Sequence, residues 1–388
     1  MKQKSKIPKN WKYEIVDNIL NNIEYGTSKI DYELKTIKIV GMKDFEDGKI
    51  NVNNLDFVNI PKRDKNKLLL KKGDILLNRT NSYDLVGKVA IYNSTDKAVF
   101  ASYLVRLNIK KEIINPYFLN YFFNLKENQL KIKSIATKAV SQANINPTQF
   151  RKKCFVLYPI KLKEQEKIVE ILELWDKAIE TTKKLIEQKK LQKKYLMQKL
   201  LTGKIRLKGF KDKWKLKKIK DICENIVVEK GTSLSSKEIS IGNIPVIAGG
   251  TVVPYFHDKY THDFPCITIS ASGAYAGYVW YHENKIWASD CNVLYGVEYS
   301  TKFLFYYLSK MQHYIYKLQL GGAQPHVYPS EIMEISVPYI TISEQKAIAD
   351  ILSTADKQID LLKQKFSKLE LQKKGLMQKL LTGQIRVC

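Results

Sequence analysis

The chain has 388 residues, of which 44% are hydrophobic and 27% charged, a composition that gives two or three globular domains with cores of their own. A formal net charge of +26 favours a polyanionic partner. Because the sequence has no run of 18 apolar residues, no secretory signal and no CxxC pair, we expect a cytoplasmic protein without a membrane span or disulfide framework.

The positive charge is unevenly distributed along the chain. Residues 1–160 hold 29 lysines and arginines against 15 acidic residues, whereas residues 210–338 hold 13 against 12 and include no arginine. Lysine greatly outnumbers arginine, and lysine-rich usage also accompanies an A·T-rich genome. Charge alone therefore favours nucleic acid but leaves a generic basic surface open.

Residues 1–160 are predicted to form one mixed domain. The opening, IPKNWKYEIVDNI, is extended and then helical, and an aromatic helix, INPYFLNYFFN, comes late in the domain. A small-polar loop, ATKAVSQANINPTQF, and a short strand, CFVLYPI, follow this helix. Between the opening and the helix, β-branched and aromatic runs bounded by Gly, Asn and Asp predict strands. These runs are Lys35–Val40, Asp74–Leu77, Gly87–Tyr92 and Ser102–Leu107.

The next stretch of the chain occurs twice. It runs from Glu164 to Arg206 and returns without a gap 180 residues later, from Glu344 to Arg386, with more than half of the positions identical. Both copies begin with EQ and end with LMQKLLTG-x-IR. A repeat at one fixed offset indicates a duplicated building block.

Each copy has the apolar spacing of a coiled-coil helix. Apolar residues recur at steps of four and three, with polar breaks at Thr182, Lys189, Lys193 and Lys373. A seam this long and narrow lacks partners within a compact domain. We therefore predict that the two copies pack antiparallel on each other. The alternative is that they are two surface helices of ordinary domains. The predicted seam comprises Ile168, Leu172, Trp175, Ile179, Ile186, Leu196, Leu200, Ile348, Leu352, Ala355, Ile359, Leu362, Phe366, Leu369, Leu376 and Leu380.

Both predicted helices carry signals at their ends. Thr341 and Glu344 have the S/T-x-x-E spacing of a capping box at the start of the second helix. Gly203 and Gly383, directly after Leu-Leu-Thr, lie where a left-handed glycine ends a helix. Glu164 and Glu344 are then acidic residues that face the positive end of a helix dipole.

Residues 207–338 repeat the plan of residues 1–160 with a different sequence. FKDKWKLKKIKDI aligns Trp214 with Trp11, and a GTS string recurs after each opening. Strands are predicted around IPVIAGGT, PCITISASGAYAGYVWY and IWASDCNVLYG, before an aromatic helix and the strand EISVPYI. We therefore predict an α+β protein with two similar mixed α/β domains, residues 1–160 and 207–338. Each domain is followed by a long helical region, residues 161–206 and 339–388. The two helical regions are predicted to form an intramolecular antiparallel coiled coil, which gives the chain pseudo-two-fold symmetry.

This arrangement resembles the specificity (S) subunits of Type I restriction–modification systems, in which two variable target-recognition domains are each followed by a similar helical region. The helical regions of that family typically carry the EQ-x-x-I start and the L-M-Q-K-L-L-T-G-x-I-R end present here. SQANINPTQF, and more loosely AQPHVYPSEI, resemble the loop that the family places before the helix. The resemblance covers the whole chain.

The resemblance implies a non-catalytic subunit whose two domains each read one half of a bipartite target in double-stranded DNA. The paired helices would set the spacing of the half-sites and dock two methyltransferase (M) subunits, which bind S-adenosylmethionine and methylate adenine. Restriction (R) motor-nuclease subunits, with ATP and Mg²⁺, would complete the complex. The alternatives are a basic coiled-coil scaffold that binds nucleic acid or protein without sequence specificity, and a self-contained methyltransferase or nuclease.

No motif in the chain predicts chemistry of its own. The string NPYF at residues 115–118 lacks the second proline of a methyltransferase motif, and a helix N-cap explains it. No GxxxxGK[ST] phosphate loop occurs. We therefore predict no catalytic residue, no bound cofactor and no metal. The metal-ligand residue types of the second domain match no zinc spacing; they are His257, His262, Cys266, His282 and Cys291.

Sequence reading requires side chains at base edges, mostly on loops. In residues 1–160, Arg79 is the leading candidate because arginine binds guanine through two hydrogen bonds; an arginine that simply covers a hairpin is the alternative. It belongs to a polar cluster between two predicted strands, and the small-polar loop is the second candidate segment. The predicted DNA-binding residues of this domain are Asn78, Arg79, Thr80, Asn81, Ser82, Lys138, Ser141, Gln142 and Asn144.

In residues 207–338, a loop of small residues allows the DNA backbone to approach closely. The predicted DNA-binding residues here are Ser270, Ser272, Gly273, Ala274, Tyr275, Gln324 and His326. Since residues 210–338 lack arginine, this domain must read DNA through lysine, Asn, Gln, Ser or His contacts, or through DNA shape.

Overall fold

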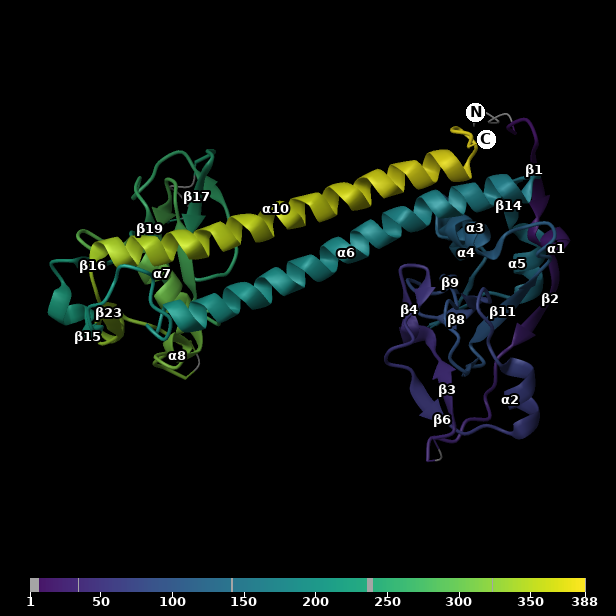
Figure 1. Ribbon diagram of the computed structural model, residues 1–388, viewed down its shortest axis with the longest axis horizontal. Coiled ribbons are helices and arrows are strands. Elements are labelled where there is room, and N and C mark those ends of the chain that lie inside the picture. Colours follow the sequence, from purple (N-terminus) through teal and green to yellow (C-terminus); the bar gives the residue numbers. More distant parts are fainter. Residues whose placement is uncertain (1–6, 34, 141, 236–239, 323, 388) are drawn as a thin grey trace. The chain divides into compact units, whose positions relative to one another are not determined.

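The computed structural model describes residues 7–33, 35–140, 142–235, 240–322 and 324–387 (Figure 1). It contains two compact units, residues 1–181 with 366–388, and residues 182–365. Two long helices, α6 (Leu162–Leu200) and α10 (Ile342–Leu381), each contribute residues to both units. Within the described ranges, no helix is both long and apolar enough to cross a membrane. The mixed α/β content and the two long helices confirm the predicted fold class.

The first domain, from β1 to β14, is built on a six-stranded sheet of order β2-β11-β7-β9-β5-β4, beside a three-stranded sheet of order β10-β3-β6. Its first and last strands, β1 and β14, pair antiparallel. Its elements are β1 (Trp11–Ile15), α1 (Val16–Ile19), β2 (Leu20–Tyr25), β3 (Ile37–Val40), η1 (Met42–Asp44), β4 (Phe45–Glu46), β5 (Lys49–Ile50), β6 (Asp56–Val58), α2 (Lys62–Leu68), β7 (Ile75–Asn78), β8 (Thr80–Asn81), β9 (Val89–Ile91), β10 (Ala98–Phe100), β11 (Leu104–Ile109), α3 (Pro116–Phe123), α4 (Lys126–Ser134), β12 (Thr137–Lys138), β13 (Ala143–Asn144), α5 (Pro147–Lys153) and β14 (Phe155–Pro159).

Both faces of the six-stranded sheet are buried, so its central strands are apolar at consecutive positions. In β7, Ile75 and Leu77 belong to the core that contains α3, α5 and the start of α6. Leu76 points to the opposite face and packs with the sheet β10-β3-β6. Burying each such side chain stabilises the domain by about 1.5–3 kcal/mol.

The second domain, from β15 to β23, repeats this topology with fewer strands. Its order β16-β22-β19-β20 reproduces β2-β11-β7-β9. The order β18-β17-β21 reproduces β6-β3-β10, including the single parallel pair. The predicted duplication is therefore present in strand order as well as in sequence. The elements are β15 (Lys215–Lys218), η2 (Ile219–Ile222), β16 (Ile226–Lys230), β17 (Ile244–Ile247), β18 (Phe256–His257), β19 (Cys266–Ser270), β20 (Val279–His282), β21 (Trp287–Ala288), β22 (Cys291–Gly296), α7 (Thr301–Lys310), α8 (Gln312–Tyr316), α9 (Pro329–Met333) and β23 (Ser336–Tyr339).

The two long helices pack antiparallel within each unit. In the first unit, the start of α6 lies beside the end of α10, and Ile168 shares a core with Leu380 (Figure 1). In the second unit, the end of α6 lies beside the start of α10, and Leu200 shares a core with Leu352. Every residue of the predicted seam is buried or half-buried. The ends of the seam also join the cores of the globular domains, because apolar residues on adjacent helix faces extend the contact.

An arginine–glutamate–tryptophan junction joins the two helical copies in each unit. In the first unit, Arg386 Nε and Nη2 donate to the two carboxylate oxygens of Glu164 at 2.6 and 2.8 Å. The guanidinium lies over the ring of Trp11, whose Nε1 also donates to Glu164. The same junction in the second unit consists of Arg206, Glu344 and Trp214. Each arginine thus binds the glutamate of the other copy, which explains why the repeat begins with Glu and ends with Arg.

This junction changes the predicted roles of the helix ends. Glu344 N donates to Thr341 Oγ1 at 3.4 Å, but the Glu344 carboxylate binds Arg206, so only half of the capping box forms. The predicted left-handed glycines are confirmed, with φ of +67° at Gly203 and +71° at Gly383.

The glutamine that follows each junction glutamate ties the helix to its own domain. Gln165 Oε1 accepts from the backbone N of Asn115 at 2.7 Å, and Gln345 Oε1 accepts from Ser300 N at the same distance. Asn115 and Ser300 are the N-caps of the equivalent helices α3 and α7. The NPYF string is therefore a helix start, as predicted.

Two of the lysines that interrupt the seam, Lys373 and Lys193, are ion-paired, whereas Lys189 Nζ donates to Gln192 Oε1. Lys373 of α10 binds Asp176 of α6, and the hydroxyl of Tyr121 in α3 donates to the same carboxylate at 2.7 Å. Burial raises the pKa of the Asp176 carboxyl, but hydrogen bonds from Lys373, Lys49 and Tyr121 outweigh burial and hold the pKa below its usual range. The equivalent cluster in the second unit consists of Lys193, Asp356 and Tyr306. These polar positions thus fix the helix register rather than weaken the contact.

Candidate nucleic-acid interface

The two predicted DNA-binding segments of the first domain come together in one small sheet. β8 pairs antiparallel with β13, and β13 pairs with β12. Asn144 Nδ2 donates to Thr80 Oγ1 at 3.1 Å and links the segments through side chains as well. Residues more than 50 positions apart in the sequence thus form a single polar surface.

Arg79 lies between β7 and β8 with its backbone fixed on both sides. Its N donates to Tyr103 O at 3.0 Å, and its O accepts from Ile145 N at 2.7 Å. The guanidinium lies 5.1 Å from the ring centroid of Tyr25, and Nε is buried without a hydrogen-bond partner. Across the part of the chain that the structure describes, Arg79 has no carboxylate partner. Its side chain is therefore oriented by an aromatic ring while most of its donors stay available to a ligand.

Four of the six arginines, Arg106, Arg151, Arg206 and Arg386, are already engaged by carboxylates. Arg206 and Arg386 form the helix junctions, and Arg151 binds Asp17. Arg63 lies exposed on α2. Arg79 is thus the arginine that combines a fixed position on the polar surface with available donors.

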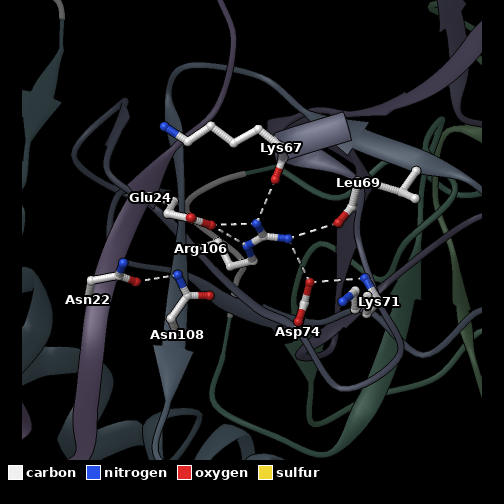
Figure 2. Close-up of polar contacts among 8 residues, drawn as sticks. All are labelled: Asn22, Glu24, Lys67, Leu69, Lys71, Asp74, Arg106 and Asn108. Carbon is white, nitrogen blue, oxygen red and sulfur yellow. Dashed lines mark hydrogen bonds and ion pairs between the residues drawn. The ribbon is translucent and has the colours of Figure 1, made fainter. Parts of the chain in front are cut away.

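Arg106 illustrates a fully engaged arginine in the same domain (Figure 2). Its guanidinium donates to Glu24 and Asp74 and to the backbone oxygens of Lys67 and Leu69 at the end of α2. These five hydrogen bonds occupy all five N–H groups, and only 8% of the residue is exposed. Arg106 therefore holds α2 on the sheet and is not available to DNA.

The exposed edge of the small sheet carries further positive charge. Lys138 Nζ lies 3.8 Å from the ring centroid of Tyr83, and Lys133 Nζ lies 4.7 Å from it. Ser82 and Gln142 are exposed, whereas Asn81 is half-buried. The predicted residue Ser141 lies outside the described residues. Tyr25 and Lys133 were not predicted for this surface, because only the tertiary structure brings them beside the loop. Tyr83, which was not predicted either, directly follows Ser82 in the sequence.

Asn78, which was predicted to contact DNA, lies in a buried strand. Asn78 is the last residue of β7 rather than part of an exposed loop, and 0% of it is accessible. Strand β7 extends one residue beyond the apolar residues Ile75–Leu77, because Asn78 pairs with Leu104 of β11 and the backbone N of Asn78 donates to Lys88 O. The side-chain amide has no hydrogen-bond partner among the described residues.

The two predicted segments of the second domain also meet. Ser272 forms an antiparallel bridge with His326, and Gly273 N donates to Pro325 O at 3.0 Å. Gly273 has a φ of +82°, which favours glycine at this turn. Ala274, Tyr275 and Gln324 are exposed.

His326 and Ser270, two of the predicted residues of this domain, lie in different surroundings. The His326 ring stacks on Tyr328, with their centroids 5.8 Å apart. Ser270, which was also predicted to contact DNA, is buried in β19 rather than in the loop. Its backbone bonds with Tyr278 and Gly277 hold the strand in place.

The loop surfaces of the two domains are equivalent in their backbone pairing. Ile145 N donates to Arg79 O in the first domain, and Val327 N donates to Ala271 O in the second. Alanine thus occupies the position of Arg79. The second domain therefore lacks a guanidinium at the position where the first domain has Arg79, its best candidate for base reading.

His262, His282 and Cys266 of the second domain have defined surroundings within that domain. Within the described ranges, no group of three or more His, Cys, Asp or Glu side chains could hold a metal ion. His262 Nε2 lies 2.7 Å from Glu229 Oε1, and His282 Nε2 lies 2.8 Å from Thr268 Oγ1. Burial raises the pKa of the Cys266 thiol to about 12, so this cysteine is an unreactive core residue.

The burial of His282 predicts acid sensitivity of the second domain. Burial and the nearby His262 lower the pKa of His282 to about 4, against about 6.5 for an unfolded histidine. Between these values the unfolded chain binds a proton that the folded domain does not. We expect the free energy of unfolding to fall with decreasing pH, by at most about 1.4 kcal/mol per pH unit from this residue. Hydrogen exchange in β20 between pH 7 and 4.5 measures this slope.

In the His282→Gln variant, the slope due to this residue should disappear. Replacing His313, which is exposed on α8, provides the control and should leave the slope unchanged. An equal slope in the His282→Gln variant would contradict the assignment of a buried neutral histidine.

Two similar α/β domains, each with a polar loop surface and each joined to the same pair of helices, define a duplicated recognition protein. A model of the family described as "Type I restriction modification DNA specificity domain" matches residues 13–190 and 211–371. The chain therefore belongs to the family of Type I restriction–modification specificity subunits, and its two domains are recognition domains.

Individual relatives agree with this family. The chain is 32% identical to a putative Type I restriction enzyme MjaX specificity subunit of Methanocaldococcus jannaschii, over 98% of this chain and 95% of the relative. It is 26% identical to the MjaVIII specificity subunit of the same organism, over 83% and 81% of the two chains. The crystal structure of an S subunit from M. genitalium has the same fold, with a TM-score of 0.67, 20% identity and coverage of 98% and 99%.

Proposed function

We propose that each recognition domain reads one half of a bipartite DNA target, the first half through Arg79 and the second without a guanidinium. The observation that carries this proposal is the pair of equivalent loop surfaces, one with a ring-stacked arginine and one with alanine at the same position. Bidentate arginine contacts to guanine are the commonest specific contacts in the major groove. The first domain also has a large excess of basic over acidic residues, 29 against 15, which favours binding to phosphates.

The proposal assigns the long helices a second role. Since α6 and α10 each contribute to both units, their length sets the spacing between the half-sites, and their duplicated surfaces dock two methyltransferase subunits. These subunits bind S-adenosylmethionine and methylate adenine, and restriction subunits supply ATP- and Mg²⁺-dependent cleavage, all in the cytoplasm. A solved structure of similar fold, with a TM-score of 0.60 and 14% identity, belongs to work on complex assembly of the Type I system.

Mapping of methylated adenines tests this function directly. With the chain present in its host, we expect methylation at one bipartite motif, two short specific halves around a spacer of fixed length. Deleting the chain should remove methylation at this motif. A matched selection of random duplexes by the purified chain should enrich the same two halves. A basic scaffold without specificity predicts no enriched motif in either measurement, and this outcome would contradict the proposal.

A further inference from the structure

Strand register identifies the residues that stand beside the reading loop in each domain. In the first domain, Tyr25 at the end of β2 pairs with Val105 of β11, and Val105 pairs with Leu77 of β7. Arg79 follows two positions beyond Leu77, on the same side of the strand. This register explains how the Tyr25 ring reaches the guanidinium of Arg79.

The second domain has the same register with different residues. Lys230 at the end of β16 pairs with Asn292 of β22, and Asn292 pairs with Ile269 of β19. Ala271 follows two positions beyond Ile269. Tyr25 and Lys230 each precede the GTS string of their domain. Lys230 therefore occupies the position of Tyr25, and Ala271, two strands away, occupies the position of Arg79.

The face that carries Lys230 also carries the reading loop. Side chains of paired residues on neighbouring strands point to the same face of a sheet, so Lys230 and Asn292 share one face. Asn292 Nδ2 donates to Val327 O at 2.9 Å, and Val327 is the neighbour of His326 in the loop. Lys230 is exposed and has no ion pair with a described residue. Its side chain can thus extend over Ala271 into the space that a guanidinium fills in the first domain.

We propose that Lys230 supplies the cation of the second recognition domain and contacts a guanine of the second half-site. The proposal rests on the proposed function and names a specificity-determining residue for it. A lysine ammonium donates hydrogen bonds to guanine O6 and N7. The two domains would then read guanine with cations placed on different strands, Arg79 after β7 and Lys230 at the end of β16.

The surroundings of the loop favour a base edge over a phosphate as the ligand. Ala271 N donates to Asp290 O at 3.2 Å, just as Arg79 N donates to Tyr103 O, so Asp290 stands in the position of Tyr103. The Asp290 carboxylate accepts a hydrogen bond from Ser272 Oγ in the loop. A carboxylate at this place repels phosphate, whereas it can accept from the N4 amine of cytosine. A lysine and a carboxylate on one surface therefore match a G·C pair.

Selection of random duplexes by the full-length Lys230→Met variant tests the proposal. We expect the guanine preference at one position of the second half-site to fall about 10- to 100-fold, with the first half-site unchanged. Lys230→Arg should keep this preference, because a guanidinium makes the same contacts. Lys217→Met removes the same charge from the β15–β23 sheet and serves as the control.

Three outcomes would overturn the proposal. One is an unchanged second half-site in Lys230→Met. Another is a uniform loss of affinity for all duplexes with a salt dependence reduced by about one counterion, which indicates a phosphate contact. A wild-type chain that selects no motif in either half would overturn the proposed function as well, whereas the first two outcomes leave it standing.

Discussion

Replacing Arg79 with alanine is expected to abolish the guanine preference in one half of the DNA target and to leave the other half intact. The guanidinium has no carboxylate partner in the described structure, and the Tyr25 ring holds it beside the loop surface. A bidentate guanine contact contributes about 1–3 kcal/mol of discrimination. Competition between duplexes that differ at a single base pair of the first half-site measures this loss.

Two further variants separate base reading from simple charge. Arg63→Ala removes another arginine without a described carboxylate partner, exposed on α2, and should leave every base preference unchanged. Tyr25→Leu keeps the arginine but removes its stacking partner, so we expect a smaller loss, on the order of 0.5–1 kcal/mol. If Arg63→Ala relaxes the guanine preference while Arg79→Ala does not, the assignment of Arg79 is wrong.

Replacing Arg206 with methionine is expected to destabilise the second unit by about 3 kcal/mol, because it leaves a buried carboxylate without its cation. The Glu344 side chain is 3% exposed, and both of its oxygens accept from Arg206. Only Trp214 Nε1 would remain as a described partner. Hydrogen exchange in the first turns of α10 measures the loss locally, which suits a protein with more than one domain.

A double-mutant cycle with Glu344→Gln tests whether the two residues act as a pair. Since both variants remove the same charge-assisted contact, their effects should combine to much less than their sum. The matched control is Lys190→Met, which breaks an exposed ion pair with Glu187 on the same helix and should have little effect. Additive effects of Arg206→Met and Glu344→Gln would contradict the junction.

The corresponding junction in the first unit should be less sensitive. Glu164 and Arg386 have more exposed side chains than Glu344 and Arg206, at 11% and 30% against 3% and 25%. Solvent therefore screens the isolated Glu164 carboxylate more effectively, and Arg386→Met should cost less than Arg206→Met when measured in the same way.

Local signals in the sequence were sufficient for the architecture. The fixed offset of 180 residues revealed the duplication, and the steps of four and three predicted the packing of α6 and α10. The glycines after Leu-Leu-Thr predicted both helix ends, since a left-handed cap depends on residue type and position alone. The central strands followed from their apolar runs and the turn residues around them.

Only the tertiary structure decided which side chains form the site. Asn78 and Ser270 belong to polar stretches of sequence, yet backbone pairing draws both into buried strands. Arg386 and Glu164 are 222 residues apart, and the sequence identified them as repeat ends but not as partners. The equivalence of Lys230 with Tyr25 depends on register across three strands. Periodicity and caps arise from neighbours along the chain, whereas partners, burial and register arise from contacts between distant segments, which one sequence does not specify.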